Sequence, residues 1–249
     1  MRIRYVPVAL LAAAALALPA APTTPAAAGT APPAPRSPAH PVRPEPAPTT
    51  PTPAPRPFVD RYVQRIATSD RVVFITIDDG TYKDPAFLAR LRRTHLPVSV
   101  FLTNAAASGS GVDYFRALQS AGAVIEDHTL HHPYLTTASP SVRRDEVCGA
   151  ADKDLRSFGR RAELLRPPYG AWNASVLATA KACGLHAVVG WDAVMPDHGG
   201  LQTWNGRGRL QPGDIVLLHF LPGLDGQIAR LLATIRAQHL RVALLEDYL

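Results

Sequence analysis

Apolar runs alternate with helical patterns from about residue 70 to the end of the chain. Short apolar or β-branched runs predict strands, at 72–77, 98–102, 123–126, 163–165, 187–190, 214–218 and 240–244. Stretches with helix-boundary residues or helical periodicity lie between them, at 84–94, 112–121, 139–157, 173–183 and 225–238. Strands that alternate with helices indicate a mostly parallel sheet. We therefore expect an α/β fold, a distorted (β/α) barrel with about seven parallel strands; an open doubly wound sheet is the alternative.

The beginning of the chain has a different composition from the rest. Two arginines precede an apolar run, and small residues follow it, which predicts a secretory signal peptide over 1–29. The run is short for a membrane span, which needs about 20 apolar residues, so we expect no stable span after cleavage. An uncleaved anchor is the alternative. Residues 30–57 are dominated by Pro, Ala and Thr and predict a linker. Residues 58–249 fit one domain.

Charge and cysteine content narrow the class of protein. The net charge is +6, but the basic residues are spread out and no aromatic residues interleave with them, so we expect no nucleic-acid partner. A mildly basic exported protein suits anionic cell-wall polymers, which predicts a secreted, extracellular protein with cell-wall association as an option. Cys148 and Cys183 are the two cysteines. In an exported protein we expect them to form a disulfide, with two buried thiols as the alternative. The sequence gives no indication of oligomeric state.

Two acidic residues and two histidines have the spacing of a metal site. Asp78 and Asp79 end the first predicted strand, where neighbouring side chains point in different directions. His128 and His132 are four residues apart, which predicts that both imidazoles lie on one face of a helical turn. One Asp and two His leave zinc an open position for water or substrate. We expect Asp79, His128 and His132 to bind Zn²⁺, or another divalent metal such as Co²⁺, with Asp78 as the general base.

Further polar residues follow later strands. The carboxyl ends of parallel barrel strands converge on one face, so residues far apart in the sequence are expected to meet there. Arg166, after the fourth strand, is suited to hold a carboxylate, and the Tyr169 amide to donate to an oxyanion. His219, after the sixth strand, is the candidate general acid. An acidic partner would keep it protonated, with Asp197 the first candidate and Asp192 the second.

Other chemistries lack their sequence patterns. The chain has no Gly-x-Ser-x-Gly elbow, no Gly-x-Gly-x-x-Gly after a strand and no P-loop, which disfavours serine esterases of that type and nucleotide-binding enzymes. Adjacent Asp78 and Asp79 cannot flank a glycosidic bond from opposite sides, which disfavours a glycosidase.

These residues together resemble the polysaccharide deacetylase family, also called the NodB homology domain or carbohydrate esterase family four. The resemblance covers about 70–249 and rests on short motifs in the family's order, at Thr76–Gly80, His128–His132, Arg166–Tyr169 and Leu217–His219.

The resemblance implies a secreted, metal-dependent enzyme that removes N-acetyl groups from an amino-sugar glycan, peptidoglycan or chitin-like, and releases acetate. The implied roles agree with the metal set above and add others: Asp78 as base, Arg166 orienting it, Asp197 tuning the catalytic His, His219 as acid, Tyr169 at the oxyanion and Leu217 lining the acetyl pocket. Hydrolysis of O-acetyl esters, as on xylan, is an alternative within the family. A non-catalytic glycan-binding protein is the alternative outside enzymes.

The fourth motif departs from the family's pattern. Val194 stands in place of an Asp and His198 in place of a Trp, while the last Asp is kept as Asp197. The missing Trp helps to shape the acetyl pocket in the family, so the change concerns substrate and rate more than metal binding. Asp127 stands where an Asn is common.

Overall fold

The computed structural model describes residues 56–109, 111–204 and 206–249. The predicted signal peptide over 1–29 and all but the last two residues of the predicted linker over 30–57 lie outside the described residues. Within the described part of the chain, no helix combines the length and the apolar character needed to cross a membrane.

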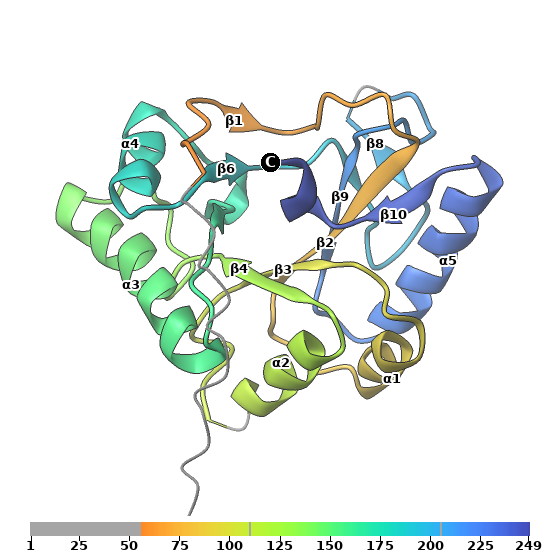
Figure 1. Ribbon diagram of the computed structural model, residues 1–249, viewed down its shortest axis with the longest axis horizontal. Helices are drawn as coiled ribbons and strands as arrows, with labels where there is room; N and C mark the ends of the chain where they lie inside the picture. The colour runs from red at the N-terminus through yellow and green to blue at the C-terminus, as the bar shows by residue number, and fades with distance from the viewer. Residues whose placement is uncertain (1–55, 110, 205) are drawn as a thin grey trace, which may run out of the picture. The chain divides into compact units, whose positions relative to one another are not determined.

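A sheet with mainly parallel strands forms the centre of the fold (Figure 1). Its strands are β1 (Tyr62–Val63), β2 (Val72–Asp79), β3 (Ser99–Leu102), β4 (Val124–Asp127), β5 (Leu164–Leu165), β6 (Ala187–Val189), β7 (Ala193–Val194), β8 (Gln202–Thr203), β9 (Ile215–His219) and β10 (Arg241–Ala243). The order is β1-β6-β5-β4-β3-β2-β9-β7-β8, and β10 pairs with the first residues of β2. Of these pairs, β7–β8 is antiparallel.

The sheet curls until its two ends approach each other. β6 pairs with β5 and β7 pairs with β9, yet the chain passes from β6 to β7 through residues 190–192 alone. The segment after β1 lies across the same gap, since the Ile66 N–H donates to the Gly213 carbonyl at 2.9 Å. This curled sheet confirms the α/β distorted-barrel prediction. All seven predicted strands are present within about two residues; β1, β7 and β8, of two residues each, are too short to give a periodic pattern.

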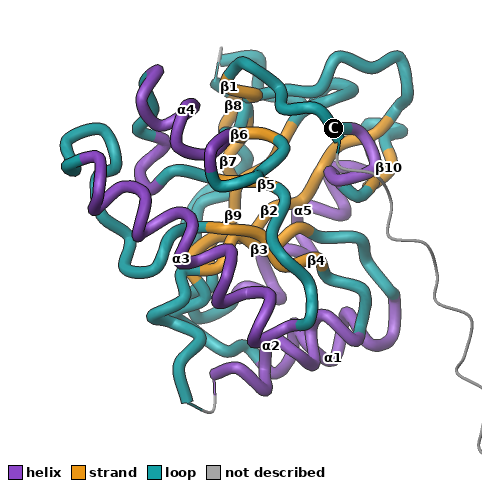
Figure 2. Tube along the Cα trace, turned by 60° about the vertical axis from the view of Figure 1, so that its left-hand side comes forward, coloured by secondary structure: helices purple, strands orange, loops and turns teal. Residues whose placement is uncertain are grey.

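Helices cover the outside of the sheet (Figure 2). They are α1 (Pro85–Thr94), α2 (Gly111–Ser120), α3 (Pro140–Phe158), α4 (Ala174–Ala182) and α5 (Leu224–Ala237), with 3₁₀ turns at Pro168–Gly170 and Leu245–Tyr248. Side-chain caps fix three of the helix starts as the sequence predicts: Asp84, Ser139 and Asn173 each accept a hydrogen bond from a backbone N–H of the first turn. The expected disulfide, Cys148–Cys183, joins α3 to the end of α4.

Alternation along β2 divides the core. Val73, Ile75 and Ile77 pack with apolar side chains of α1, α2 and α5. Val72 and Phe74 point to the opposite face, into the curl of the sheet, and pack with residues such as Phe101 and Leu245. The period of two places Thr76 and Asp78 on that inner face as well. Polar side chains at the carboxyl end of the inner face are therefore a direct result of the strand pattern.

Candidate metal and catalytic site

A cavity of about 470 Å³ opens at the carboxyl ends of the central strands. It is lined by Asp78, Asp79, His128, His132, Tyr169, Trp191, Leu217 and His219. Seven of these eight residues are among the candidates from the sequence. They come from β2, β9 and the loops after β4, β5 and β6, as expected for a parallel barrel.

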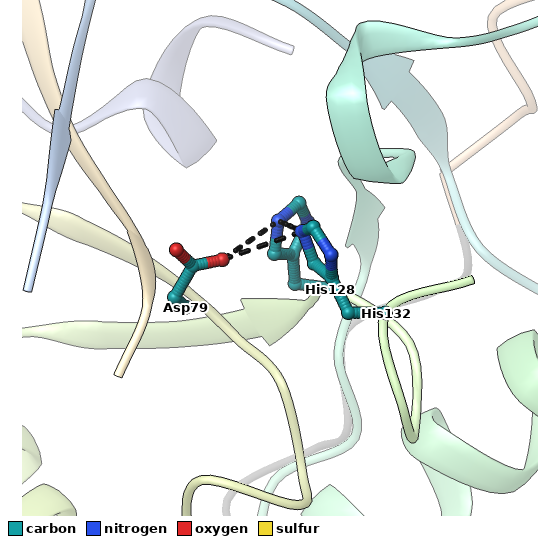
Figure 3. Close-up of side chains that lie close together, drawn as sticks. All are labelled: Asp79, His128 and His132. Carbon is teal, nitrogen blue, oxygen red and sulfur yellow. Dashed lines mark hydrogen bonds and ion pairs between the residues drawn. The ribbon is translucent and has the colours of Figure 1, made fainter. Parts of the chain in front are cut away.

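Three side chains converge as a possible metal-binding set (Figure 3). Asp79 Oδ1 lies 3.4 Å from Nε2 of His128 and 3.4 Å from Nε2 of His132. The two Nε2 atoms are 3.2 Å apart. Two imidazole nitrogens and one carboxylate oxygen that face a common point suit a divalent ion such as zinc, with positions left for other ligands.

The second ring nitrogen of His128 fixes its tautomer. His128 Nδ1 lies 2.7 Å from the Arg166 carbonyl oxygen. A carbonyl can only accept, so the hydrogen is on Nδ1 and the Nε2 lone pair faces the metal position. Burial lowers the pKa of His132, and the nearby His128 lowers it further, so this imidazole is held neutral. Burial opposes ionisation of Asp79, but the neighbouring imidazoles of His128, His219 and His132 outweigh it and lower the pKa of that carboxyl. Both shifts favour the forms that bind a divalent metal, a neutral imidazole at His132 and a carboxylate at Asp79.

The loop that carries the two histidines is not a helical turn, and this part of the prediction is wrong. Thr129 and His132 have φ values of 71° and 63°, in the left-handed region. The Asp127 carboxylate accepts from the Thr129 N–H at 2.6 Å, and the Thr129 hydroxyl accepts from the His132 N–H at 2.9 Å. These local hydrogen bonds, rather than helical spacing, bring the imidazoles together. His131 is held away from them by Glu146, 2.8 Å from its Nδ1.

Asp78 is held by a buried arginine. Arg166 Nη1 donates to Asp78 Oδ1 at 2.7 Å and to the Thr76 hydroxyl at 2.8 Å, while its Nη2 donates to the Gly190 carbonyl at 2.8 Å. The guanidinium also lies over the Phe101 ring, 4.1 Å from its centroid. The other oxygen of Asp78, Oδ2, faces His128 Nε2 at 3.8 Å. Asp78 is therefore fixed with one oxygen free beside the metal position.

A left-handed residue brings both neighbouring carboxylates to the site. Regular alternation would send Asp79 to the face opposite Asp78, but Asp79 has φ 75° and leaves the strand pattern. Gly80 follows with φ 84°, and a Cβ there would lie 2.4 Å from Leu102 Cδ1 and 2.7 Å from Phe115 Cζ. Only glycine fits this turn, which sets the position of Asp79.

Tyr169 and His219 come from either side of β2 in the sheet. Tyr169 follows β5, and His219 is the last residue of β9. Tyr169 has φ 63°, and its turn is closed by the amides of Gly170 and Ala171, which donate to the carbonyls of Pro167 and Pro168. His219 ends β9 and is paired in register with Asp78 of β2. Leu217, two residues earlier on the same strand, lines the cavity.

Asp197 does not join this cluster. Its carboxylate accepts from the backbone N–H of His198 at 2.9 Å, and it is not among the residues that line the cavity. Among residues 56–109, 111–204 and 206–249, no hydrogen bond or ion pair joins it to His219. The second candidate, Asp192, is paired with Arg207 at 2.6 Å. The structure therefore brings neither carboxylate to the imidazole of His219.

Sequence reasoning missed two residues that shape the site. Thr76 accepts from Arg166 and donates to the Val216 carbonyl at 2.8 Å, so it ties the arginine to β9. Thr76 lies two residues before Asp78 on one strand, and this spacing could have identified it as a site residue, because both side chains then lie on the same face. Trp191 lines the cavity, and it directly follows a predicted strand end, as the other site residues do.

Comparisons with known proteins identify the family of this chain. The sequence profile of the family described as polysaccharide deacetylase matches residues 65–188. A chitooligosaccharide deacetylase of Bradyrhizobium is 31% identical over 163 residues, which cover 60% of this chain and 70% of that protein. An uncharacterized protein of Streptomyces coelicolor is 41% identical over 191 residues, 75% of this chain and 76% of that one.

A solved structure has the same fold. A family 4 carbohydrate esterase from Bacillus anthracis superposes with a TM-score of 0.64 at 21% identity, over 76% of this chain and 87% of that one. The profile, the identity to the Bradyrhizobium protein and the shared fold lead to one conclusion. This chain belongs to the polysaccharide deacetylase family.

Proposed function

We propose that this chain is a secreted, metal-dependent deacetylase that hydrolyses N-acetyl groups of an amino-sugar glycan and releases acetate. The observation that carries the proposal is the convergence of Asp79, His128 and His132 beside an Asp78 that Arg166 holds in place. Family membership supports hydrolysis of acetylated glycans, and similarity to the chitooligosaccharide deacetylase of Bradyrhizobium supports an amino-sugar substrate. Residues 1–29, with the pattern of a signal peptide, support secretion.

Asp79, His128 and His132 would hold the metal, and zinc is the ion that suits this set best. When bound there, the ion supplies Lewis acidity to an acetyl carbonyl and to water. The Oδ2 oxygen of Asp78 accepts the proton that water loses as it attacks the carbonyl carbon. Arg166 keeps that carboxylate oriented through its hydrogen bond to Oδ1.

Other residues of the cavity act on the oxyanion, the departing nitrogen and the acetyl methyl group. The Tyr169 N–H donates a hydrogen bond to the oxyanion that develops on the acetyl oxygen. His219 donates a proton to the sugar nitrogen as its bond to the acetyl carbon breaks. The acetyl methyl group lies against Leu217 and Trp191, which supply apolar lining. The products are acetate and a free amino sugar.

The test is acetate release by the purified chain from oligomers of N-acetylglucosamine, with zinc added and with a chelator. Release that the chelator abolishes and zinc restores is the expected result. No release from N-acetylated glycans by protein that binds one zinc per chain would overturn the N-deacetylase assignment. Release from acetylated xylan alone would establish the ester-hydrolase alternative. Glycan binding without acetate release from either substrate would establish a binding protein.

A further inference from the structure

Two tyrosines form an exposed stacked pair beside the cavity. The rings of Tyr134 and Tyr169 have centroids 3.9 Å apart and an interplanar angle of 16°. Both residues are highly exposed, 53% for Tyr134 and 54% for Tyr169. Large aromatic side chains contribute most to a fold when they are buried, so a stacked pair with this exposure contributes little to the core.

The pair is attached to a candidate metal ligand from two directions. Tyr169 lines the cavity, its ring packs edge-on against the His132 ring at 4.7 Å, and its hydroxyl donates to the His132 carbonyl at 3.4 Å. Tyr134 follows His132 with Pro133 between them. The stacking surface therefore begins at the rim of the cavity and extends away from it.

Both rings are held in place before any ligand arrives. Pro133 and the Pro167–Pro168 pair fix backbone angles next to the two tyrosines, and Tyr169 is in a left-handed turn. One face of the Tyr134 ring is covered by Tyr169. A preorganised aromatic face loses little conformational entropy when a flat ligand packs on it.

Trp172, on the same loop as Tyr169, shows a different arrangement. Its ring stacks on Tyr62 with centroids 4.9 Å apart, and Tyr62 packs with the apolar cluster of α3 and α4. Trp172 thus helps to seat its loop on the core. Among the described residues, the Tyr134 ring makes one aromatic contact, with Tyr169, and belongs to no core cluster.

We infer that the outer face of Tyr134 binds the sugar ring next to the one whose acetyl group enters the cavity. Pyranoses with equatorial substituents present flat C–H faces, and such faces pack on aromatic rings, so the ligand class is a β-linked glucosamine-type oligosaccharide of two or more residues. The inference rests on the proposed function, because it names the substrate form that the same site takes. A cavity of about 470 Å³ is of ligand-pocket size but is confined to the metal centre, so neighbouring sugars lie outside it, over the tyrosine pair.

The test compares binding of the N-acetylglucosamine monomer and of its β-1,4-linked tetramer to the full, metal-free chain, in which no hydrolysis occurs, by calorimetry. The wild-type chain is expected to bind the tetramer more tightly than the monomer. Tyr134→Ala and Tyr134→Leu should weaken tetramer binding about five- to tenfold, and Tyr134→Phe, which keeps the aromatic face, should restore it. Melting temperature and zinc stoichiometry verify that each variant is folded with an intact metal set.

The outcomes separate the inference from the proposed function. Equal tetramer affinity in the Ala, Leu and wild-type chains overturns the inference, as does a wild-type chain that binds monomer and tetramer equally. Acetate release with no dependence on Tyr134 leaves the deacetylase standing without this sugar-binding surface. Tetramer binding that depends on Tyr134, in a chain that releases no acetate, confirms the surface and overturns the enzymatic proposal.

Discussion

Arg166 fixes Asp78 through a hydrogen bond of 2.7 Å between Nη1 and Oδ1. Both side chains are buried, and breaking the pair would leave a charge without a partner in a low-dielectric interior. The carboxylate is therefore held with Oδ2 directed to the metal position, 3.8 Å from His128 Nε2. A base that is positioned before substrate binds needs no reorganisation during the reaction.

Asp78→Asn should separate proton transfer from metal binding. The amide keeps the shape of the side chain and can still accept from Arg166, but it cannot take a proton from water. We expect kcat to fall by at least about 10²-fold, while zinc stoichiometry stays near that of the wild type. Acetate release and elemental analysis on one preparation measure both quantities. Full activity in the variant would contradict the role of Asp78 as base.

His132→Ala, compared with His131→Ala, should show which histidine of the loop binds metal. The His132 Nε2 faces Asp79 and His128, whereas His131 pairs with Glu146. Loss of a direct ligand is expected to weaken zinc binding by more than the about 10- to 100-fold typical of an outer partner. His131→Ala should bind zinc like the wild type. Titration with a competing chelator measures the affinities, and equal losses in both variants would refute the assignment.

The main elements were predictable because each strand of three or more residues contains or adjoins a run of apolar or β-branched residues, and several helices begin at a capping residue. The Thr76–Gly80 motif could be located from the sequence because it ends the apolar run that forms the central strand. The His128–His132 loop was not predictable from its spacing, because its form depends on hydrogen bonds from Asp127 and Thr129 and on two left-handed residues. An HxxxH pattern contains none of this information.

Contacts between distant parts of the chain set a second limit on prediction. The Arg166–Asp78 pair joins residues 88 positions apart, and it was expected from a family resemblance rather than from the residues alone. The Tyr134–Tyr169 stack depends on two loops whose meeting no local pattern indicates. Asp197 shows the reverse case: its place in a motif predicted a contact with His219, but its carboxylate turns back to its own loop.

His219→Ala should slow amide substrates more than activated esters. If His219 protonates the departing nitrogen, its loss matters most where the leaving group is a poor one. We expect kcat for an N-acetylated glycan to fall by about 10²-fold or more, and that for an aryl acetate, whose leaving group needs no proton, by less than about tenfold. Parallel assays with the two substrates test this. Equal losses on both would indicate that His219 positions substrate or water instead.

Asp197→Asn tests whether the altered fourth motif still tunes the catalytic histidine. Within the described residues Asp197 bonds to His198 and forms no hydrogen bond or ion pair with His219. We therefore expect kcat to change by less than about threefold and the pH profile of kcat to keep its shape. A large loss, with a shift of the acid-side or alkaline-side limb, would show that Asp197 reaches His219 during catalysis and that the motif keeps its tuning role.

Asp154, on α3, should make the fold less stable as the pH rises. It is fully buried; its Oδ1 accepts from Asn104 at 2.7 Å, and its Oδ2 has no partner among the described residues. Burial raises the pKa of this carboxyl from 3.8 to about 7, although the Asn104 hydrogen bond opposes the rise. The folded state therefore holds a proton that the unfolded state releases near pH 4. The contribution of protonated Asp154 to the free energy of unfolding is therefore complete below pH 4. It is lost as the pH rises through about 7, where the carboxyl ionises in the folded state.

Asp154→Asn removes this titration and keeps the oxygen that Asn104 needs. At about 1.4 kcal/mol per pKa unit, the ionised wild-type carboxyl costs at most about 4 kcal/mol at pH 8. Relative to the wild type, the free energy of unfolding of the variant should thus increase between pH 4 and pH 8. Denaturant unfolding at several pH values measures the difference, which isolates Asp154 from other buried acids such as Glu246. A difference that stays constant with pH would mean that Asp154 ionises in the folded protein as readily as in the unfolded chain.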